Sequence, residues 1–380
     1  MSLGKESIRL HAKLKGKLET KSKIKINNKK TLSIVYTPGV AAVSSAIAEN
    51  PTLAKKYTIK NNTIAVISDG SSVLGLGNVK ALAAIPVMEG KAALFKEFAG
   101  LDAFPICLDT QDTQEIIATI KNIAPIFGGI NLEDISAPRC FEIEKKLMEI
   151  LDIPVLHDDQ RGTATVVLSA LINALKVKKL SFNQTKVVVN GAGAAGTAIA
   201  KFLHAYGIKN LIVCDSQGVI NNKRKDLNSE KKLIAGWLLE ENSQTQTLEE
   251  ALDKADVFIG VSRANLLTVD LVKKMNKQPI IFALANPIPE IMPDVAKKAG
   301  AFIVATGRSD FSNQINNVLA FPGIFRGALD HSVKTITDNM LIKAAENIAA
   351  CVKKPTKEQI VPKPFDKKVV KAVAKAIKNN

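Results

Sequence analysis

Short apolar runs alternate with longer segments of helical periodicity along most of this chain. After a lysine-rich start, the run 32–42 (LSIVYTPGVAA) predicts a strand that breaks into a loop at Thr37-Pro38-Gly39. Four more strands are predicted by the runs at 63–69, 104–109, 124–134 and 153–159, with helix-like segments between them. This strand–helix–strand rhythm predicts an α/β fold with a parallel sheet.

A second α/β unit follows. An amphipathic helix is expected over 163–178, and it leads to further strand-like runs, which lie at 185–190, 210–215, 255–262, 278–287 and 301–307. The segment after Phe325 has a helical pattern. A length of 380 residues also suits two domains, which we place at 1–160 and 161–380.

Cysteine usage and hydropathy bear on the location of the protein. Its four cysteines lie far apart without a C-x-x-C pair, which argues against a disulfide scaffold and a structural zinc site. No uninterrupted apolar run reaches the roughly 18 residues of a membrane span, and the N-terminus has no hydrophobic signal region. We therefore expect a cytoplasmic protein that does not enter the membrane.

The formal charge of +16 raises the question of nucleic-acid binding. Only seven of the 52 basic residues are arginine, however, and lysine is the poorer match for bidentate recognition of bases and phosphates. No aromatic residues are interleaved with the basic ones to stack on single strands. We interpret the lysines as solvated surface, which remains compatible with attraction of small anionic molecules.

A dinucleotide-binding fingerprint lies in the second unit. Gly191-Ala192-Gly193-Ala194-Ala195-Gly196 follows a β-branched strand and opens a helix, and the next strand ends at Asp215. Gly191 permits the tight turn, Gly193 leaves room for the pyrophosphate, and Gly196 allows close packing of helix on strand. The pattern predicts a Rossmann-type NAD(P)-binding domain. Asp215 favours NAD, but the nearby Lys223 and Arg224 keep NADP possible.

Two carboxylate pairs follow two of the predicted strands of the first unit. Glu133-Asp134 and Asp158-Asp159 bring oxygen ligands without accompanying histidines or cysteines, which suits Mg²⁺ or Mn²⁺ and not zinc. Such residues are also common helix caps, so the pairs alone leave both interpretations open.

Eight motifs together resemble the malic enzyme family, in its short bacterial form without a fused acyltransferase domain. They are YTPGV (36–40), LGLGN (74–78), PVMEGKAALFKEFAG (86–100), INLEDI (130–135), HDDQRGTA (157–164), GAGAAG (191–196), LANPIPEI (284–291) and TGRSDFSNQINNVLAFPGIFRGAL (306–329). They occur in family order over nearly the whole chain. The resemblance implies oxidative decarboxylation of L-malate to pyruvate and CO₂ with NAD or NADP and a divalent cation, in a homodimer.

The resemblance also implies roles for individual residues. Lys91 is expected as the general base and Tyr36 as the general acid, with Asp158 beside Lys91. The expected metal ligands are Glu133, Asp134 and Asp159, and Asn286 and Asn317 are expected at the substrate and the nicotinamide. A base must be neutral to accept a proton. The apolar residues after Lys91 would lower its pKa and Asp158 would raise it, so the balance is open.

Two positions depart from the family pattern, and two other functions compete with it. Lys80 replaces a usual glycine, and Arg161 replaces a usual histidine, which we interpret as a surface change at a helix start. Ser72 stands where longer enzymes have an arginine. A metal-free hydroxy-acid or amino-acid dehydrogenase would not need the carboxylate pairs. A basic nucleotide-sensing or nucleic-acid-binding protein would release no CO₂.

Overall fold

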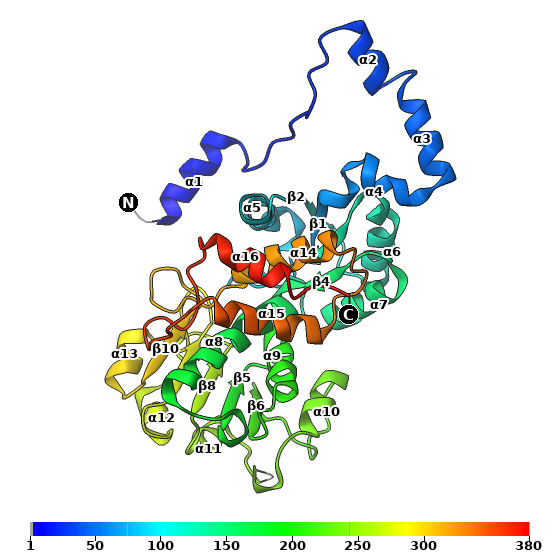
Figure 1. The fold of residues 1–380 in the computed structure, drawn as a ribbon. Helices are drawn as coiled ribbons and strands as arrows, with labels where there is room; N and C mark the ends of the chain where they lie inside the picture. The colour runs from blue at the N-terminus through cyan, green and yellow to red at the C-terminus, as the bar shows by residue number, and fades with distance from the viewer. Residues whose placement is uncertain (1–2, 74, 243, 380) are drawn as a thin grey trace.

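The computed structural model describes residues 3–73, 75–242 and 244–379, and it contains two β-sheets surrounded by helices (Figure 1). The first sheet has the strand order β2-β1-β3-β4, and every pair in it is parallel. Its strands are β1 (Thr63–Ser68), β2 (Asp102–Cys107), β3 (Gly129–Leu132) and β4 (Val155–His157). The helices between them are α5 (Lys80–Ala99), α6 (Thr113–Ile123) and α7 (Arg139–Ile150), with the short η3 (Ala124–Ile126).

Alternating side chains of β1 pack into separate cores on the two faces of this sheet. Ile64 and Val66 belong to the core that contains Phe95 of α5, whereas Ala65 and Ile67 belong to the core under α6 and α7. A strand that is buried on both faces has apolar residues at successive positions. This explains why the run at 63–69 predicts a strand.

The second sheet has the order β10-β9-β8-β5-β6-β7, in which β7 is antiparallel to β6 and the other pairs are parallel. Its strands are β5 (Val187–Asn190), β6 (Leu211–Asp215), β7 (Gly218–Val219), β8 (Val257–Gly260), β9 (Ile280–Ala283) and β10 (Ile303–Thr306). The connecting helices are α9 (Ala194–Ala205), α10 (Ser229–Ala235), α11 (Leu248–Leu252), α12 (Val269–Lys274) and α13 (Pro293–Lys298), with η5 (Phe182–Gln184) and η6 (Glu240–Asn242). This is the predicted Rossmann-type architecture.

A single π-helical turn, η4 (Asp158–Gly162), connects the first sheet to α8 (Thr163–Lys178) and so to the second sheet. The prediction that α8 is amphipathic is wrong, because other helices enclose it and most of its residues are buried. After η7 (Asn317–Leu319) the chain returns towards the first sheet through α14 (Phe321–Asp330), α15 (Asp338–Ala350) and α16 (Lys367–Ala374). Here α14 packs on α5, and α15 packs on α8.

The N-terminal segment stands away from this body as an arm (Figure 1). Its helices are α1 (Leu3–Leu14), α2 (Lys29–Val35) and α3 (Val40–Glu49), followed by η1 (Pro51–Leu53), α4 (Ala54–Tyr57) and η2 (Ile59–Asn62). The predicted strand at 32–42 is therefore wrong. Asn28 caps α2 by accepting a hydrogen bond from the Thr31 N–H at 2.8 Å, and the segment belongs to neither sheet.

The stretch Lys29–Glu49 of the arm is largely apolar, although none of the residues of α2 and α3 is buried. By length and composition, the 21 residues of Lys29–Glu49 could cross a membrane, which the sequence analysis did not anticipate. The stretch is interrupted, because α2 ends at Val35 and α3 begins at Val40.

Candidate active site

The two predicted carboxylate pairs lie at the carboxyl ends of neighbouring strands. Glu133 and Asp134 directly follow β3, and Asp158 and Asp159 form the start of η4 after β4. Glu133, Asp134 and Asp158 are buried, whereas the Asp159 side chain is 31% exposed. The Asp134 backbone N–H donates to Asp159 Oδ2 at 2.7 Å, so the two pairs are in direct contact.

Lys91 reaches this group from the middle of α5. Its Nζ lies 2.6 Å from Asp158 Oδ2, 2.9 Å from Glu133 Oε1 and 4.2 Å from the centre of the Phe321 ring. Burial by itself would lower the pKa of Lys91, but the carboxylates of Asp158 and Glu133 outweigh it and raise the pKa above its ordinary value. In this arrangement Lys91 is an ammonium.

The group carries more negative charge than its single lysine balances. Burial raises the pKa of Asp158 to about 7 and also raises the pKa values of Glu133 and Asp159, in spite of the nearby ammonium. Asp158 Oδ1 is buried and accepts no hydrogen bond in the described structure. Buried carboxylates with this surplus of charge suit a hard divalent cation.

The side chains of this group are therefore of the type that binds a divalent cation. Across residues 3–73, 75–242 and 244–379, however, no three His, Cys, Asp or Glu side chains converge as they would around an ion. Asn131, which the sequence analysis did not single out, donates to Glu133 Oε2 at 2.8 Å and orients that carboxylate.

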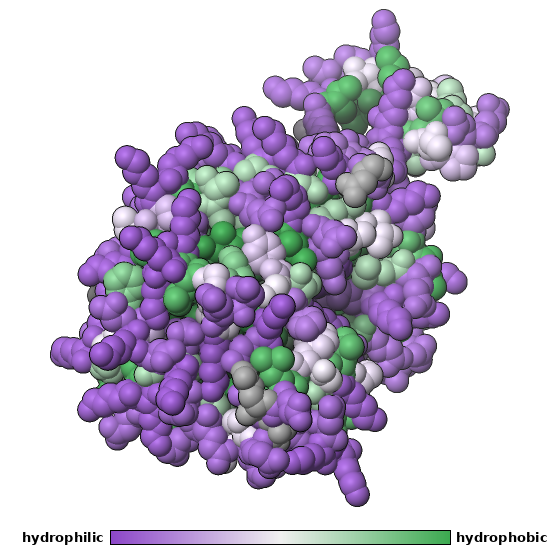
Figure 2. Space-filling view, turned by 60° about the horizontal axis from the view of Figure 1, so that its bottom comes forward, coloured by the Kyte–Doolittle hydropathy of each residue, from purple (hydrophilic) through white to green (hydrophobic). Residues whose placement is uncertain are grey.

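Tyr36 does not join this group within one subunit. It follows α2 on the arm, and its side chain is 66% exposed. Figure 2 shows the arm as a separate lobe at the upper right, in which hydrophobic atoms lie among hydrophilic ones. The expected acid and the expected base are thus on separate parts of the chain.

The GAGAAG segment has the geometry of a phosphate-binding turn. Gly191 has φ +111° and approaches the Val261 carbonyl, and a Cβ on Gly196 would lie 1.6 Å from the Gly191 oxygen. A Cβ on Gly193 would meet no atom within 4 Å, so open space lies where the pyrophosphate is expected. Ala194 and Ala195 begin α9, whose N-terminus offers its backbone N–H groups there, and Ala192 is buried.

Asp215 ends β6 and borders a hollow of about 560 Å³, together with Gly191 and Gln217. Its carboxylate is bound by Arg224 and by Lys231. Of these two, Lys231 was not predicted from the sequence. Lys223 instead lies 3.5 Å from Gln244 Oε1. Burial would raise the pKa of Asp215, but hydrogen bonds from Arg224 and Lys231 lower it below its ordinary value.

Asn286 and Asn317 lie in segments that follow the second sheet's strands and contact other loops of the chain. A Cβ on Gly75, in the loop before α5, would lie 2.7 Å from the Asn286 carbonyl, so this loop touches the turn after β9. Leu74 of the same LGLGN motif lies outside the described residues. Asn317 begins η7, which packs against η4.

Family models match both parts of the chain. The malic enzyme N-terminal domain covers residues 15–148, and the malic enzyme NAD-binding domain covers residues 160–379. The chain belongs to the malic enzyme family.

Individual relatives agree with this membership. A bifunctional malic/malolactic enzyme of Bacillus subtilis is 52% identical over 99% of this chain and 92% of its own length. An NAD-dependent malic enzyme of Geobacillus stearothermophilus is 55% identical over 95% of this chain and 76% of its own. The crystal structure of an NAD-dependent malic enzyme from Thermotoga maritima superposes with a TM-score of 0.95 at 51% identity, over 98% of this chain and 99% of its own.

The two departures from the malic enzyme pattern have structural consequences. Lys80 has φ +63°, in the left-handed region that favours glycine, so the loop keeps the conformation although the residue differs. The interpretation of Arg161 as a surface change is wrong, because its side chain is only 11% exposed. Arg161 donates to the Ile336 carbonyl at 2.6 Å and to Asp338 at 2.8 Å, and it thereby ties η4 to the start of α15.

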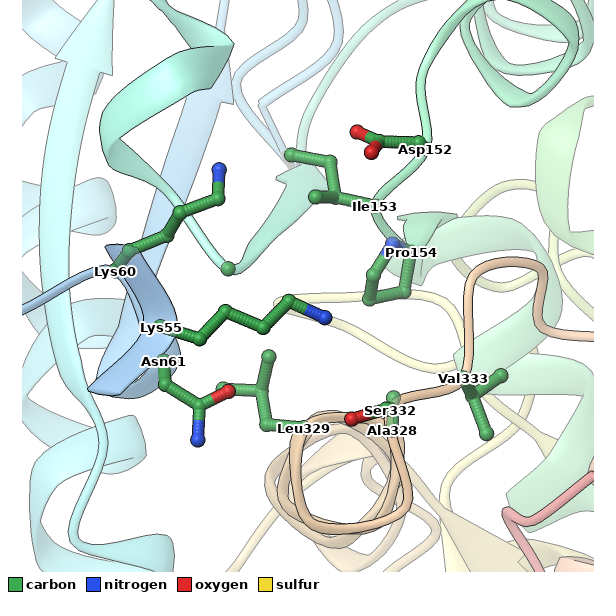
Figure 3. A pocket seen from close by; sticks show the side chains of 11 residues that line it. Lys55, Lys60, Asn61, Asp152, Ile153, Pro154, Ala328, Leu329, Ser332 and Val333 are labelled. Atoms are coloured by element: carbon green, nitrogen blue, oxygen red, sulfur yellow. The ribbon is translucent and has the colours of Figure 1, made fainter. Parts of the chain in front are cut away.

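A further small pocket lies at the amino ends of β3 and β4, where Gly128 and Pro154 directly precede these strands (Figure 3). Lys55 and Lys60 enter it from one side, Asp152 and Pro154 from another, and Leu329 from α14 below. Its free volume of about 10 Å³ has room for about one water molecule. It is too small for a substrate.

Proposed function

We propose that this protein catalyses the oxidative decarboxylation of L-malate to pyruvate and CO₂, with reduction of NAD or NADP and the assistance of Mg²⁺ or Mn²⁺. The observation that carries the proposal is the buried group of Lys91, Asp158 and Glu133. It lies beside oxygen ligands at the carboxyl ends of β3 and β4, in a chain that also has a Rossmann-type turn. Family membership supports the same chemistry.

Glu133, Asp134 and Asp159 are the residues that would hold the divalent cation. When bound, the cation would supply positive charge to the C2 hydroxyl and a carboxylate oxygen of malate, and the dinucleotide would accept the hydride from C2. The carboxylates that now raise the pKa of Lys91 would then be partly neutralised. Lys91 could therefore pass its proton to Asp158, whose Oδ2 lies 2.6 Å from Nζ, and then take the proton of the C2 hydroxyl.

Loss of CO₂ from the resulting keto acid leaves an electron pair on C3, which must receive a proton to give pyruvate. We infer that Tyr36 donates this proton. The Phe321 ring and the α14 helix cover Lys91, and they exclude water from the region where the proton moves.

We infer that Tyr36 acts in a second copy of the chain, in a symmetric homodimer. The arm exposes Leu32, Ile34, Val40 and Val43, and α5 exposes Leu82 at 81%. Contiguous apolar surface of this kind is usually covered by a partner, and a twofold arrangement would cover both surfaces with one type of contact. Such an exchange would bring each Tyr36 to the Lys91 of the other subunit.

Subunit mixing tests this arrangement. Tyr36→Phe and Lys91→Ala should each nearly abolish pyruvate formation from malate alone. When the two variants are unfolded together and refolded in equal amounts, exchange across the dimer restores one complete site per mixed dimer, or about a quarter of the wild-type activity. No recovery, with dimers present by light scattering, would show that Tyr36 acts within its own subunit.

The activity itself is tested by incubating the wild-type chain with L-malate, either dinucleotide and Mn²⁺, and by measuring reduced dinucleotide, pyruvate and CO₂. A chelator should stop all three. Reduction that persists without divalent metal would favour a metal-free dehydrogenase. Salt-dependent binding of DNA or RNA without turnover would favour the basic binding protein.

A further inference from the structure

A second large hollow lies away from the dinucleotide turn, between the first half of α15 and the residues after α16. It is lined by residues of the segments 332–347 and 375–379, and we call it the C-terminal hollow. The two segments come together because α15 and α16 pack on each other (Figure 1). The volume of the hollow is about 910 Å³, compared with about 560 Å³ for the hollow beside Asp215. It therefore has room for a small-molecule ligand.

The lining of the C-terminal hollow is positively charged. It includes Lys334, Lys343, Lys375 and Lys378, and no aspartate or glutamate of the described residues lines it. Lys343 donates to Glu346 Oε2 at 2.7 Å, whereas the other three lysines form no ion pair within the described part of the chain. Uncompensated ammonium groups that share one hollow raise the local concentration of anions.

The remaining polar side chains of the lining are neutral hydrogen-bonding groups, such as those of Ser332, Thr335 and Asn339. Among the described residues that line the hollow there is no arginine, whose planar fork matches a carboxylate in two parallel bonds. Lysine binds phosphate as a point charge, and hydroxyl and amide groups can donate to the further phosphate oxygens. Spread over a hollow of this size, these groups suit an anion with several phosphates.

The C-terminal hollow is connected to the active site through one side chain. The segment 334–339 lines the hollow and also holds Arg161, which donates to the Ile336 carbonyl at 2.6 Å and to Asp338 Oδ1 at 2.8 Å. Arg161 belongs to η4, the turn that begins with Asp158. A ligand that orders the segment 334–339 would therefore also restrain η4.

We propose that the C-terminal hollow binds a small molecule with several phosphate groups, and that its occupancy is transmitted through Arg161 to η4. The regulatory meaning of this site rests on the proposed function, which places the aspartates of η4 in the active site.

Calorimetric titration of the full-length chain with inorganic tripolyphosphate tests the binding. NADH is titrated first and then kept saturating, so that it occupies the GAGAAG turn, and divalent metal is left out. In Lys334→Met/Lys378→Met the Kd for tripolyphosphate should rise about tenfold or more, because charge-assisted bonds are lost. Lys367→Met/Lys371→Met is the matched control, since it removes the same formal charge from exposed positions of α16 outside the hollow, and it should leave the Kd unchanged.

Three results would overturn the binding site: no binding by the wild-type chain, equal weakening in both variant pairs, which would indicate general surface charge, or citrate binding as tightly as tripolyphosphate, which would contradict the phosphate assignment. If NADH fails to bind, the proposed function loses its support. The comparison of the two variant pairs would still decide on the hollow, because both pairs retain the GAGAAG turn.

Hydrogen exchange measured by mass spectrometry tests the transmission to η4 without any need for turnover. Tripolyphosphate should slow amide exchange in peptides that cover the segment 334–339 and η4, and α12 serves as the control element that should not respond. Slower exchange at 334–339 with unchanged exchange at η4 would overturn the transmission through Arg161.

Discussion

Two glycines of the GAGAAG turn should respond in opposite ways to the same substitution. Gly193 has an extended backbone with φ −83° and ψ −155°, which alanine also adopts, and its new Cβ would touch nothing within 4 Å. At Gly196 the new Cβ would lie 1.6 Å from the Gly191 oxygen and 3.2 Å from Val261 Cγ2. We therefore expect Gly193→Ala to affect the dinucleotide and Gly196→Ala to affect the fold.

The magnitudes follow from these contacts. Gly193→Ala reduces the entropy of the unfolded chain but replaces glycine at the N-cap of α9, so its free energy of unfolding should stay within about 1 kcal/mol of wild type. Its methyl group occupies the approach of the pyrophosphate, and loss of one charge-assisted hydrogen bond weakens NADH binding about tenfold or more. Gly196→Ala forces α9 away from β5, which costs about 3 kcal/mol of stability.

Urea unfolding without dinucleotide gives the stabilities, and quenching of NADH fluorescence gives the dissociation constants. The variants serve as controls for each other, because they insert the same methyl group three residues apart. If folded Gly193→Ala bound NADH as tightly as wild type, the pyrophosphate would not lie at the N-terminus of α9. An unchanged urea midpoint for Gly196→Ala would contradict the close packing of α9 on β5.

Three further predictions concern stability and reactivity. Lys80→Gly should raise the free energy of unfolding by about 1 kcal/mol, measured in urea, because it removes a lysine from the left-handed region. Arg161→His, which restores the family residue, should lower it by about 1–2 kcal/mol, since the bonds to Ile336 and Asp338 are lost; an unchanged midpoint would contradict the tie between η4 and α15. In thiol labelling at pH 8, Cys140 and Cys214 should react after the two half-buried cysteines, because burial raises the pKa of both to about 12; labelling of all four at one rate would refute this.

The fold was predictable where local pattern and tertiary burial agree. The runs at 63–69 and 185–190 each contain consecutive apolar residues, at 64–67 and 187–189, and both form interior strands that are buried on two faces. The run at 32–42 has β-branched residues but no neighbouring strand, and the Asn28 cap starts a helix there. Propensity alone could not reveal this, because strand formation depends on a partner elsewhere in the chain.

Some residues of the candidate site could likewise be predicted from the sequence, and others could not. Glu133 and Asp158 were predictable because each follows a strand, and the carboxyl ends of parallel strands share an edge of the sheet. Phe321 was not, because its contact with Lys91 joins two elements that are far apart in sequence, and Lys231 was not, because only the placement of α10 brings its side chain to Asp215. The buried position of Arg161 likewise depends on α15, which lies much later in the sequence.

The cover over Lys91 shows why the two halves of the chain need each other. The lysine lies in the first half, but the Phe321 ring above it belongs to the second, and Phe95 packs against the same ring at 4.7 Å. Without α14, the ammonium and its carboxylates would face water, which screens their interaction and weakens the buried pairing that sets the pKa of the lysine. The buried pairing of Lys91 in the first half of the chain therefore depends on α14, which comes from the second half and packs on α5.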